Sequence, residues 1–306
     1  MKNKIAVIIG ARGIGDLIYH LPLLKSLHQS YNEKLIIFSN RANKAKEVFK
    51  DEKFFKKIIY IDNHRYNPLV TIINSFKFKS FLNSYKIERI ILTSNAKRLI
   101  LPVLMSNAKI KNFFGTGKFL LTKDKKNDHL TVSERLLKYT AELDLPKKIW
   151  DFNLTINSQN IENKKNIFIS VDSHHDQNNW GLVNYLKIIN ALRKDHKIFL
   201  NFSPNKKEIL KFFLDRKIFF KNIVFTHKKN ISQIIEIIKK CQYVIGNESG
   251  PVCLGASFRK KVHAIYLPIH TKPESKIIFK KNKYYNASKI KPNFIIKKII
   301  NSIKLN

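Results

Sequence analysis

Short apolar runs alternate with amphipathic stretches along the first half of the chain. Each run is rich in Ile, Val, Leu and Phe, and apolar residues at helical spacing follow it. The predicted strands span residues 4–10, 34–39, 57–61, 88–93 and 109–114, and the predicted helices span residues 15–29, 42–50, 69–85, 97–105 and 132–143. Continuous apolar runs are typical of parallel strands, which are buried on both faces. The alternation therefore predicts a parallel sheet with helices on both sides.

The same alternation restarts after a polar interruption. Residues 115–128 are polar, basic and contain glycine, which indicates a loop, and residues 146–165 have weak periodicity and many Asn and Lys residues. The later predicted strands span residues 166–171, 197–202, 222–225, 242–246 and 262–267, and the later predicted helices span residues 180–194, 206–214, 231–240, 249–258 and 294–303. We place the domain linker within residues 146–165.

The pattern predicts two doubly wound α/β domains in tandem, residues 1–155 and residues 156–306. A chain of 306 residues is long enough for two such domains, each with its own core. Two domains of this kind are expected to bind a ligand in a cleft where the carboxyl ends of their strands face each other.

The charge is far from balanced, with 58 Lys and Arg residues against 22 Asp and Glu residues and a net charge of +36. Our first interpretation is a compositional bias, because the excess is mainly Lys and accompanies heavy use of Ile and Asn. An anionic partner such as a lipid surface or polyanionic glycan comes second. Nucleic acid comes third and is not expected as a partner, because the sequence lacks zinc-finger spacing, a heptad zipper and a ribonucleoprotein motif.

The sequence predicts a cytoplasmic protein. Its two cysteines, Cys241 and Cys253, do not make a disulfide framework in a chain of this length, which fits a reducing compartment. We find no stretch of 18 uncharged apolar residues that would predict a transmembrane helix. The apolar start is interrupted by Arg12 and Asp16 before it reaches the length of a signal peptide. A peripheral position on the inner face of the inner membrane agrees with these observations.

The first candidate site is the stretch Gly10-Ala11-Arg12-Gly13-Ile14-Gly15-Asp16, between a predicted strand and a predicted helix. Glycines there allow a sharp turn and a close approach of the backbone to a ligand. The stretch is not the dinucleotide fingerprint, because G-x-G-x-x-G does not occur. Asp16 is either a general base at the mouth of a cleft or a helix cap, and residue type alone favours the cap.

The second candidate site is residues 246–256, which follow a predicted strand and open a predicted helix. The free N–H groups of a helix start, among small residues, suit a diphosphate, and Ser249 adds a hydroxyl. Capping by Ser249 and close packing at Gly255 and Ala256 explain the same residues equally well. Cys253 has no patterned His partner, so we interpret it as a small buried residue.

The third candidate site is Ser173-His174-His175-Asp176-Gln177-Asn178-Asn179-Trp180, between a strand and a helix. We predict no metal site here, because neighbouring residues in an extended stretch point in opposite directions and no other cluster supports one. A hydrogen-bonding loop near a phosphate and a plain polar loop remain equal alternatives. The sequence has no Walker P-loop, no H-E-x-x-H and no G-x-S-x-G.

These three segments, in this order, resemble glycosyltransferase family 9, the heptosyltransferase family, over nearly the whole chain. The family's strongest motif, Gly-Asn-Asp-Ser/Thr-Gly-Pro-x-His-Leu-Ala-Ala, is matched with intact spacing by residues 246–256. Supporting matches are the pair Gly15-Asp16 with Pro22, the basic helix start Asn95-Ala96-Lys97-Arg98, and His129 before Glu134-Arg135.

The resemblance implies the GT-B fold and an inverting, metal-independent transfer of a heptose or similar sugar. The donor is then a nucleotide-diphosphate sugar, of the ADP type by family, and no other cofactor is needed. The acceptor is then a lipopolysaccharide core or another anionic, lipid-linked glycan. In the family the acidic residue after the first Gly-rich turn is the base, so the resemblance gives Asp16 that role. The last helix is expected to pack back on the first domain.

The resemblance also assigns the two binding sites. The first domain is implied to bind the acceptor through Arg12, Gly13, Gly15, Lys97, Arg98 and His129. The second is implied to bind the donor through Ser173, His174, Asn178, Gly246, Asn247, Glu248, Ser249, Gly250 and Cys253.

Three positions depart from the family pattern. Glu248 replaces an Asp, Cys253 replaces a His, and Asn178 stands where the family often has a Lys. Loss of a cation near the donor's phosphates weakens stabilisation of the leaving group, by roughly a few kcal/mol if nothing replaces it. The alternative hypothesis is therefore a catalytically degenerate GT-B-like protein that binds a nucleotide sugar or glycan.

Overall fold

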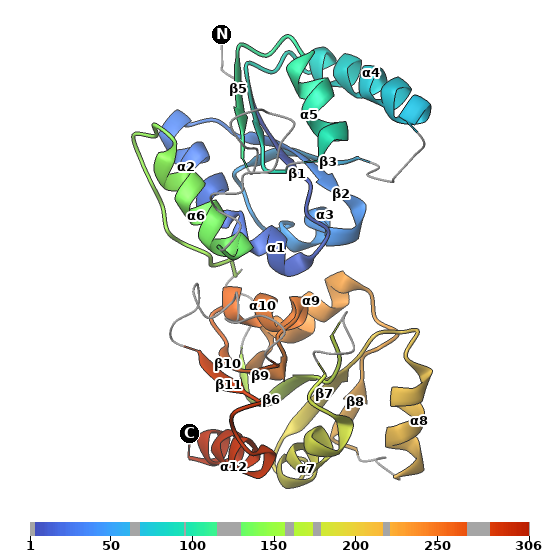
Figure 1. The fold of residues 1–306 in the computed structure, drawn as a ribbon. Coiled ribbons are helices and arrows are strands. Elements are labelled where there is room, and N and C mark those ends of the chain that lie inside the picture. Colours follow the sequence, from blue (N-terminus) through green and yellow to red (C-terminus); the bar gives the residue numbers. More distant parts are fainter. Residues whose placement is uncertain are drawn as a thin grey trace. The chain divides into compact units, whose positions relative to one another are not determined.

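The computed structural model describes residues 4–61, 68–94, 96–114, 130–156, 162–173, 179–216, 221–267 and 282–305. The chain divides into two compact units, Met1–Phe152 and Asn153–Asn306. Each unit is built on one parallel sheet with helices packed on both of its faces (Figure 1). The predicted class, two doubly wound α/β domains, is confirmed.

The described part of the first unit contains a five-stranded parallel sheet in the order β3-β2-β1-β4-β5. Its strands are β1 (Ile5–Ile9), β2 (Leu35–Asn40), β3 (Phe55–Ile61), β4 (Arg89–Leu92) and β5 (Ile110–Phe113). Its helices are α1 (Ile14–Tyr19), α2 (Leu21–Tyr31), α3 (Ala45–Val48), α4 (Pro68–Ser84), α5 (Lys97–Leu104) and α6 (Val132–Glu142), with a 3-10 turn at Arg41–Asn43. The central strands β1 and β2 are buried along their whole length, which explains why they read as continuous apolar runs.

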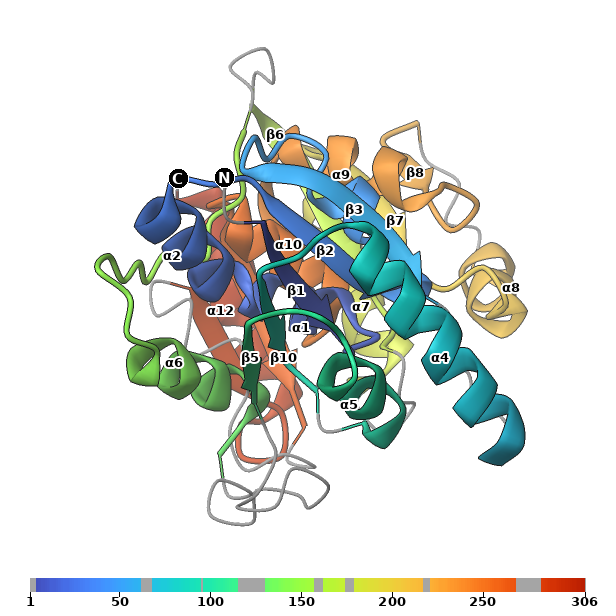
Figure 2. The ribbon, with the colours of Figure 1, turned by 90° about the horizontal axis from the view of Figure 1, so that it is seen from above.

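Helices cover both faces of the first sheet. Figures 1 and 2 show α4 and α5 on one face and α2 and α6 on the other. The core under α4 and α5 joins Ile8 and Phe38 from the strands to Leu82 and Leu99 from the helices. On the opposite face, α6 packs against α1 and α2.

The described part of the second unit contains a six-stranded parallel sheet in the order β11-β10-β9-β6-β7-β8. Its strands are β6 (Asn163–Ser170), β7 (Lys197–Asn201), β8 (Ile223–Phe225), β9 (Cys241–Asn247), β10 (Lys261–Tyr266) and β11 (Lys283–Asn286). Its helices are α7 (Leu182–Leu192), α8 (Lys207–Asp215), α9 (Ile231–Lys239), α10 (Gly250–Ser257) and α12 (Pro292–Lys304). Figure 1 shows α7, α8 and α12 on one face of this sheet and α9 and α10 on the other.

The last helix, α12, contributes to the core of the second unit. Ile295, Ile299 and Ile303 are buried in the same apolar cluster as Tyr185 and Ile189 of α7. This cluster accounts for the apolar face of α12. That α12 also packs back on the first domain stays a prediction.

The structure differs from the predicted elements at three places. The predicted helix of residues 42–50 is a 3-10 turn at Arg41–Asn43 followed by the short helix α3, with Lys44 between them in the left-handed conformation. The predicted helix of residues 15–29 is two helices that meet at His20, because Pro22 has no N–H to continue the hydrogen bonds of α1. Strand β11 was not predicted, because Lys283-Tyr-Tyr-Asn is a short edge strand without an apolar run. Within the described ranges, no helix is long and apolar enough to span a membrane.

Candidate functional site

The candidate residues of each unit gather at the point where the strand order of its sheet reverses. In the first sheet this point lies between β1 and β4, and in the second it lies between β6 and β9. In open α/β sheets, ligands bind at the carboxyl ends of the strands at such a point. Asp16 follows β1, and the segment Gly246–Gly250 covers the end of β9 and the start of α10.

Asp16 lies half-buried in the first turn of α1. Its Oδ2 accepts the backbone N–H of Gly13 at 3.3 Å. Burial raises the pKa of Asp16 above its usual value, and the hydrogen bond from Gly13 opposes that shift. The N-cap of α1 is Gly13 rather than Asp16, and the Asp16 carboxylate takes part in the capping box as the third helical residue. It is also a stronger proton acceptor than an exposed aspartate.

His20, one turn after Asp16, is a buried residue that sequence analysis did not single out. Its Nδ1 lies 2.7 Å from the carbonyl oxygen of Asp16, and its Nε2 lies 2.8 Å from Thr93 Oγ1. Thr93 Oγ1 is also 3.1 Å from the carbonyl oxygen of Ile8. Burial lowers the pKa of His20 to about 4, so its ring is neutral at pH 7. His20 thereby ties α1, which carries Asp16, to the ends of both β1 and β4.

The loop after β1 is held by close packing. A Cβ on Gly10 would collide with the side chain of Ser94, which follows β4. The carbonyl oxygen of Ala11 accepts Asn43 Nδ2 at 3.0 Å. Residues from the ends of β1, β2 and β4 therefore meet around this loop, and only glycine fits at position 10.

In the second unit, Asn247 is the centre of a buried hydrogen-bond network. Its Oδ1 accepts the backbone N–H of Trp180 at 3.1 Å and the hydroxyl of Tyr185 at 2.9 Å. Its Nδ2 donates to the carbonyl oxygen of Val171 at 3.0 Å and to Asn179 Oδ1 at 3.3 Å. Asn247 is fully buried, and its side chain connects the ends of β6 and β9 to helix α7 through these hydrogen bonds.

The start of α10 carries the features that suit an anion. Ser249 occupies the N-cap position of the helix but makes no capping hydrogen bond, and its Oγ is buried without a hydrogen-bond partner among the described residues. Trp180 Nε1 is likewise buried without a partner in the described ranges. Pro251 has no N–H, and the other N–H groups of a first helical turn have no carbonyl within the helix to bind. Buried donors without partners cost free energy, which a bound ligand can recover.

Other residues of the second candidate site have structural partners. A Cβ on Gly246 would lie 2.5 Å from the carbonyl oxygen of Ser170, so this position in β9 requires glycine. The Glu248 N–H donates to the carbonyl oxygen of Ile265 at 2.9 Å. Cys253 is only 2% exposed within α10, as the interpretation of a small buried residue predicts.

The remaining predicted residues are only partly placed. Gly13 precedes α1, Gly15 lies in its first turn, and Arg12 is exposed beside them. Arg98 lies in the first turn of α5, and Lys97 begins that helix. The backbone N–H of Ser173 donates to Asn179 Oδ1 at 2.8 Å. Predicted residues outside the described ranges are His129, His174 and Asn178.

The roles of His20, Thr93 and Tyr185 were missed because residue type and spacing do not reveal them. Each depends on strands brought together from distant parts of the sequence. A metal site is a separate question, and the described residues contain no group of three His, Cys, Asp or Glu side chains that could hold an ion.

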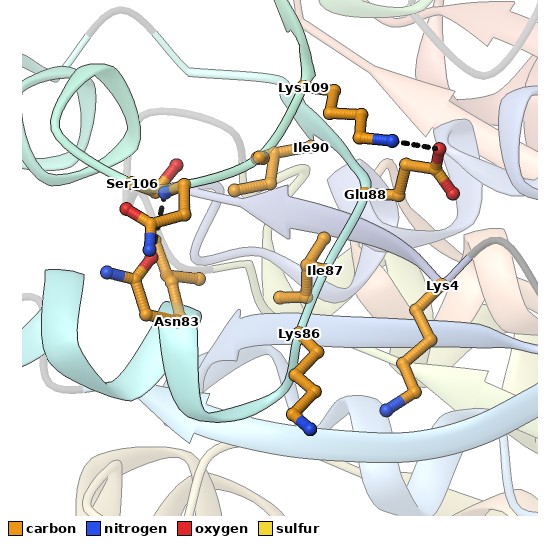
Figure 3. A pocket seen from close by; sticks show the side chains of 11 residues that line it. Lys4, Asn83, Lys86, Ile87, Glu88, Ile90, Ser106 and Lys109 are labelled. Atoms are coloured by element: carbon orange, nitrogen blue, oxygen red, sulfur yellow. Dashed lines mark hydrogen bonds and ion pairs between the residues drawn. The ribbon is translucent and has the colours of Figure 1, made fainter. Parts of the chain in front are cut away.

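Two cavities lie outside these switch points. One of about 370 Å³ lies where β1, β4 and β5 begin, the opposite edge of the first sheet from Asp16, and Figure 3 shows Lys4, Lys86 and Lys109 around it. The other, of about 380 Å³, lies beside Phe202 and His227, whose rings stack 4.7 Å apart after β7 and β8. The second cavity therefore shares the carboxyl edge of its sheet with the start of α10.

Comparisons with known proteins agree with this geometry. The model of glycosyltransferase family 9 (heptosyltransferase) matches residues 121–297, which is more than half of the chain. A search of curated proteins found no match in sequence.

Solved structures show the same fold. The family 9 glycosyl transferase of Veillonella parvula has a TM-score of 0.74 at 13% identity, over 100% of this chain and 99% of that chain. E. coli heptosyltransferase WaaC with ADP has a TM-score of 0.74 at 15% identity, over 98% and 99%. E. coli ADP-heptose lipopolysaccharide heptosyltransferase II has a TM-score of 0.70 at 13% identity, over 99% and 98%. The predicted GT-B fold class is confirmed.

Proposed function

Because the chain belongs to glycosyltransferase family 9 and is a glycosyltransferase, we propose that it transfers a heptose or similar sugar from a nucleotide-diphosphate donor with inversion. The observation that carries this proposal is the start of α10. There the intact spacing of the family motif coincides with the buried hydroxyl of Ser249, which has no hydrogen-bond partner in the part of the chain that the structure describes. A diphosphate oxygen is the natural partner for such a hydroxyl at a helix N-terminus.

In this proposal Asp16 acts as the general base. The acceptor hydroxyl gives its proton to the Asp16 carboxylate while its oxygen bonds to the anomeric carbon of the donor. The bond between the anomeric carbon and the diphosphate oxygen breaks, and the electron pair leaves with the nucleoside diphosphate. The raised pKa of Asp16 favours proton uptake, and general base catalysis of this kind contributes about 10²–10⁴-fold.

The leaving diphosphate is stabilised by the start of α10. The N–H groups and the positive end of the helix dipole act on the charge that develops as the bond breaks. We propose that this needs no metal ion. Glu248 and Cys253 alter the family motif, so we propose that the stabilising charge comes from the helix start rather than from a histidine at position 253.

The acceptor is proposed to be anionic and lipid-linked, such as a lipopolysaccharide core. The net charge of +36 supports an anionic partner, because it attracts one over distances of about the Debye length. The exposed Arg12 beside Asp16 supports an anionic group close to the base. We propose that the protein works in the cytoplasm, peripherally on the inner face of the inner membrane.

The alternative is a catalytically degenerate protein that only binds a nucleotide sugar or glycan. The buried Cys253 in place of the family's histidine is the observation that favours it. Such a protein would still bind nucleotide at the start of α10, so binding alone does not separate the two hypotheses, whereas sugar transfer does.

The direct test of the donor site is thermal melting with ADP, UDP, GDP and CDP, each with and without magnesium. We expect one nucleotide, ADP by family resemblance, to raise the melting temperature without magnesium, because a ligand that binds only the native state stabilises it. S249A should reduce this shift, and S302A, on α12, is the matched serine control that should preserve it. No shift with any nucleotide would count against a working donor site.

A further inference from the structure

Helix α4 carries large apolar side chains on its outward face. Ile72, Ile73 and Phe76 are 47%, 55% and 50% exposed, and Phe81 is 36% exposed. Phe76 is three residues from Ile73 and four from Ile72, so it lies beside both of them on one side of the helix. Figures 1 and 2 both show the first half of α4 extending away from the sheet. These three side chains therefore form an apolar face in water.

The inward face of α4 already supplies its share of the core. Leu82 is buried, and Phe78 packs edge-on against Phe38 of β2 with ring centroids 5.7 Å apart. The outward apolar residues are thus additional to what packing on the sheet requires. A surface helix normally keeps a polar outward face, so apolar side chains exposed there indicate a further contact.

The charged residues of α4 itself have one sign. Helix α4 has no Asp or Glu, and its charged residues are Lys77 and Lys79. At its C-terminal end, Lys4 and Lys86 line the cavity shown in Figure 3. The acid of that cavity, Glu88, lies 3.7 Å from Lys109. Lysines beside exposed apolar side chains are attracted to the phosphates of an anionic bilayer, while the apolar side chains gain from entering it.

We propose that the outward face of α4, Ile72, Ile73 and Phe76 with Lys77 at its border, docks onto the surface of an anionic lipid bilayer. The three apolar side chains enter the boundary between headgroups and acyl chains, while the lysines stay at the level of the lipid phosphates. This inference rests on the proposed function, in which the acceptor is held at a membrane, and it names the surface that brings the enzyme there.

The test is co-sedimentation with vesicles of phosphatidylcholine alone and of phosphatidylcholine mixed with phosphatidylglycerol. We expect binding to the mixed vesicles, and expect I72S/I73S/F76S to weaken it at least about tenfold, because less apolar surface leaves water. The matched control is V183S/F294S, which removes two side chains of the second unit that are each 54% exposed. This control should bind as the wild type does.

Charge and catalysis are tested separately. K77Q and K79Q should each weaken binding to the mixed vesicles about fivefold, with no change on neutral vesicles. D16N should bind vesicles normally, since docking needs no turnover. Loss of sugar transfer with intact vesicle binding would overturn the proposed function but not the docking surface.

Three results would overturn the docking proposal. The first is I72S/I73S/F76S binding as tightly as the wild type, and the second is an equal loss in V183S/F294S. The third is that the wild type does not bind vesicles but forms a dimer in light scattering, and that I72S/I73S/F76S is a monomer in the same measurement. That result would assign the face to a second copy of the chain.

Discussion

Replacing Asn247 with alanine tests whether the hydrogen bonds of its buried side chain hold the loops at the candidate donor site together. The change leaves the backbone N–H of Trp180 and the hydroxyl of Tyr185 without their acceptor. It also leaves the carbonyl oxygen of Val171 without the donor Asn247 Nδ2. A buried polar group that loses its partner costs about 1–3 kcal/mol. Three such groups imply that N247A lowers the free energy of unfolding by at least about 3 kcal/mol, a large part of a typical total of about 5–15 kcal/mol.

Urea denaturation of the second unit measures this loss. The chain has two tryptophans, Trp150 and Trp180, so a W150F background leaves one reporter. Trp180 is 6% exposed and packs edge-on against Tyr185 with centroids 5.3 Å apart, so its fluorescence follows the network itself. A single reporter inside the second unit keeps the measurement to that unit, which matters because a chain with two units need not unfold in one two-state transition.

Y185F is the matched control for the network. It removes one hydroxyl, but Asn247 Oδ1 still accepts the backbone N–H of Trp180. We therefore expect the free energy of unfolding to fall by only about 1 kcal/mol. The double variant N247A/Y185F should lose less than the sum of the single variants, because it lacks the hydroxyl that N247A orphans. If N247A lowers the free energy of unfolding by less than about 1 kcal/mol, or by the same amount as Y185F, then the Asn247 side chain does not hold these loops together.

Three further predictions concern the first switch point and the glycines. D16N should raise the melting temperature at pH 8, because burial raises the pKa of Asp16 and its ionised form therefore destabilises the native state as pH rises through that pKa. His20 has a native pKa of about 4, below the ordinary 6.5, so stability should fall as pH drops from about 6.5 to 4, by about 1.4 kcal/mol per unit; H20Q should flatten this slope in pH-dependent melting. G246A should cost about 1–3 kcal/mol in urea denaturation, because its Cβ meets the Ser170 carbonyl, whereas G13A, whose Cβ first meets the movable Asp16 side chain at 2.9 Å, should cost less. Equal costs for G246A and G13A, a steeper acid slope in H20Q or a lower melting temperature for D16N would each contradict the corresponding argument.

The fold was predictable because the central strands are buried on both faces. Strands such as β1 and β2 need apolar residues at every position, and that requirement is visible in the sequence. The break at His20 and the edge strand β11 were not predicted. The break at His20 follows from a single residue, Pro22. Strand β11 is a short segment without an apolar run, and its pairing with β10 positions it.

The candidate site was predictable where local geometry dictates the residue. At Gly10 the side chain of Ser94, and at Gly246 the carbonyl oxygen of Ser170, leave no room for a Cβ. The Asp16 carboxylate accepts the Gly13 N–H at the start of α1. The contact between His20 and Thr93 joins residues 73 positions apart in the sequence, so spacing gives no sign of it. Asn247 was predicted to bind the donor. The folded structure shows that its side chain holds the surrounding loops through hydrogen bonds to Trp180, Tyr185, Val171 and Asn179, which spacing in the sequence does not reveal.

The most direct test of the central claim is sugar transfer by wild type and D16N to a lipopolysaccharide-core acceptor. The donor would be the nucleotide sugar selected by thermal melting, and a chelator would remove divalent metal. We expect the wild type to transfer the sugar with inversion, and D16N to be slower by about 10²–10⁴-fold while keeping its nucleotide-induced thermal shift. Transfer by D16N at the wild-type rate would contradict the role of Asp16. Nucleotide binding without transfer by the wild type would contradict the enzyme proposed here and favour a degenerate binding protein.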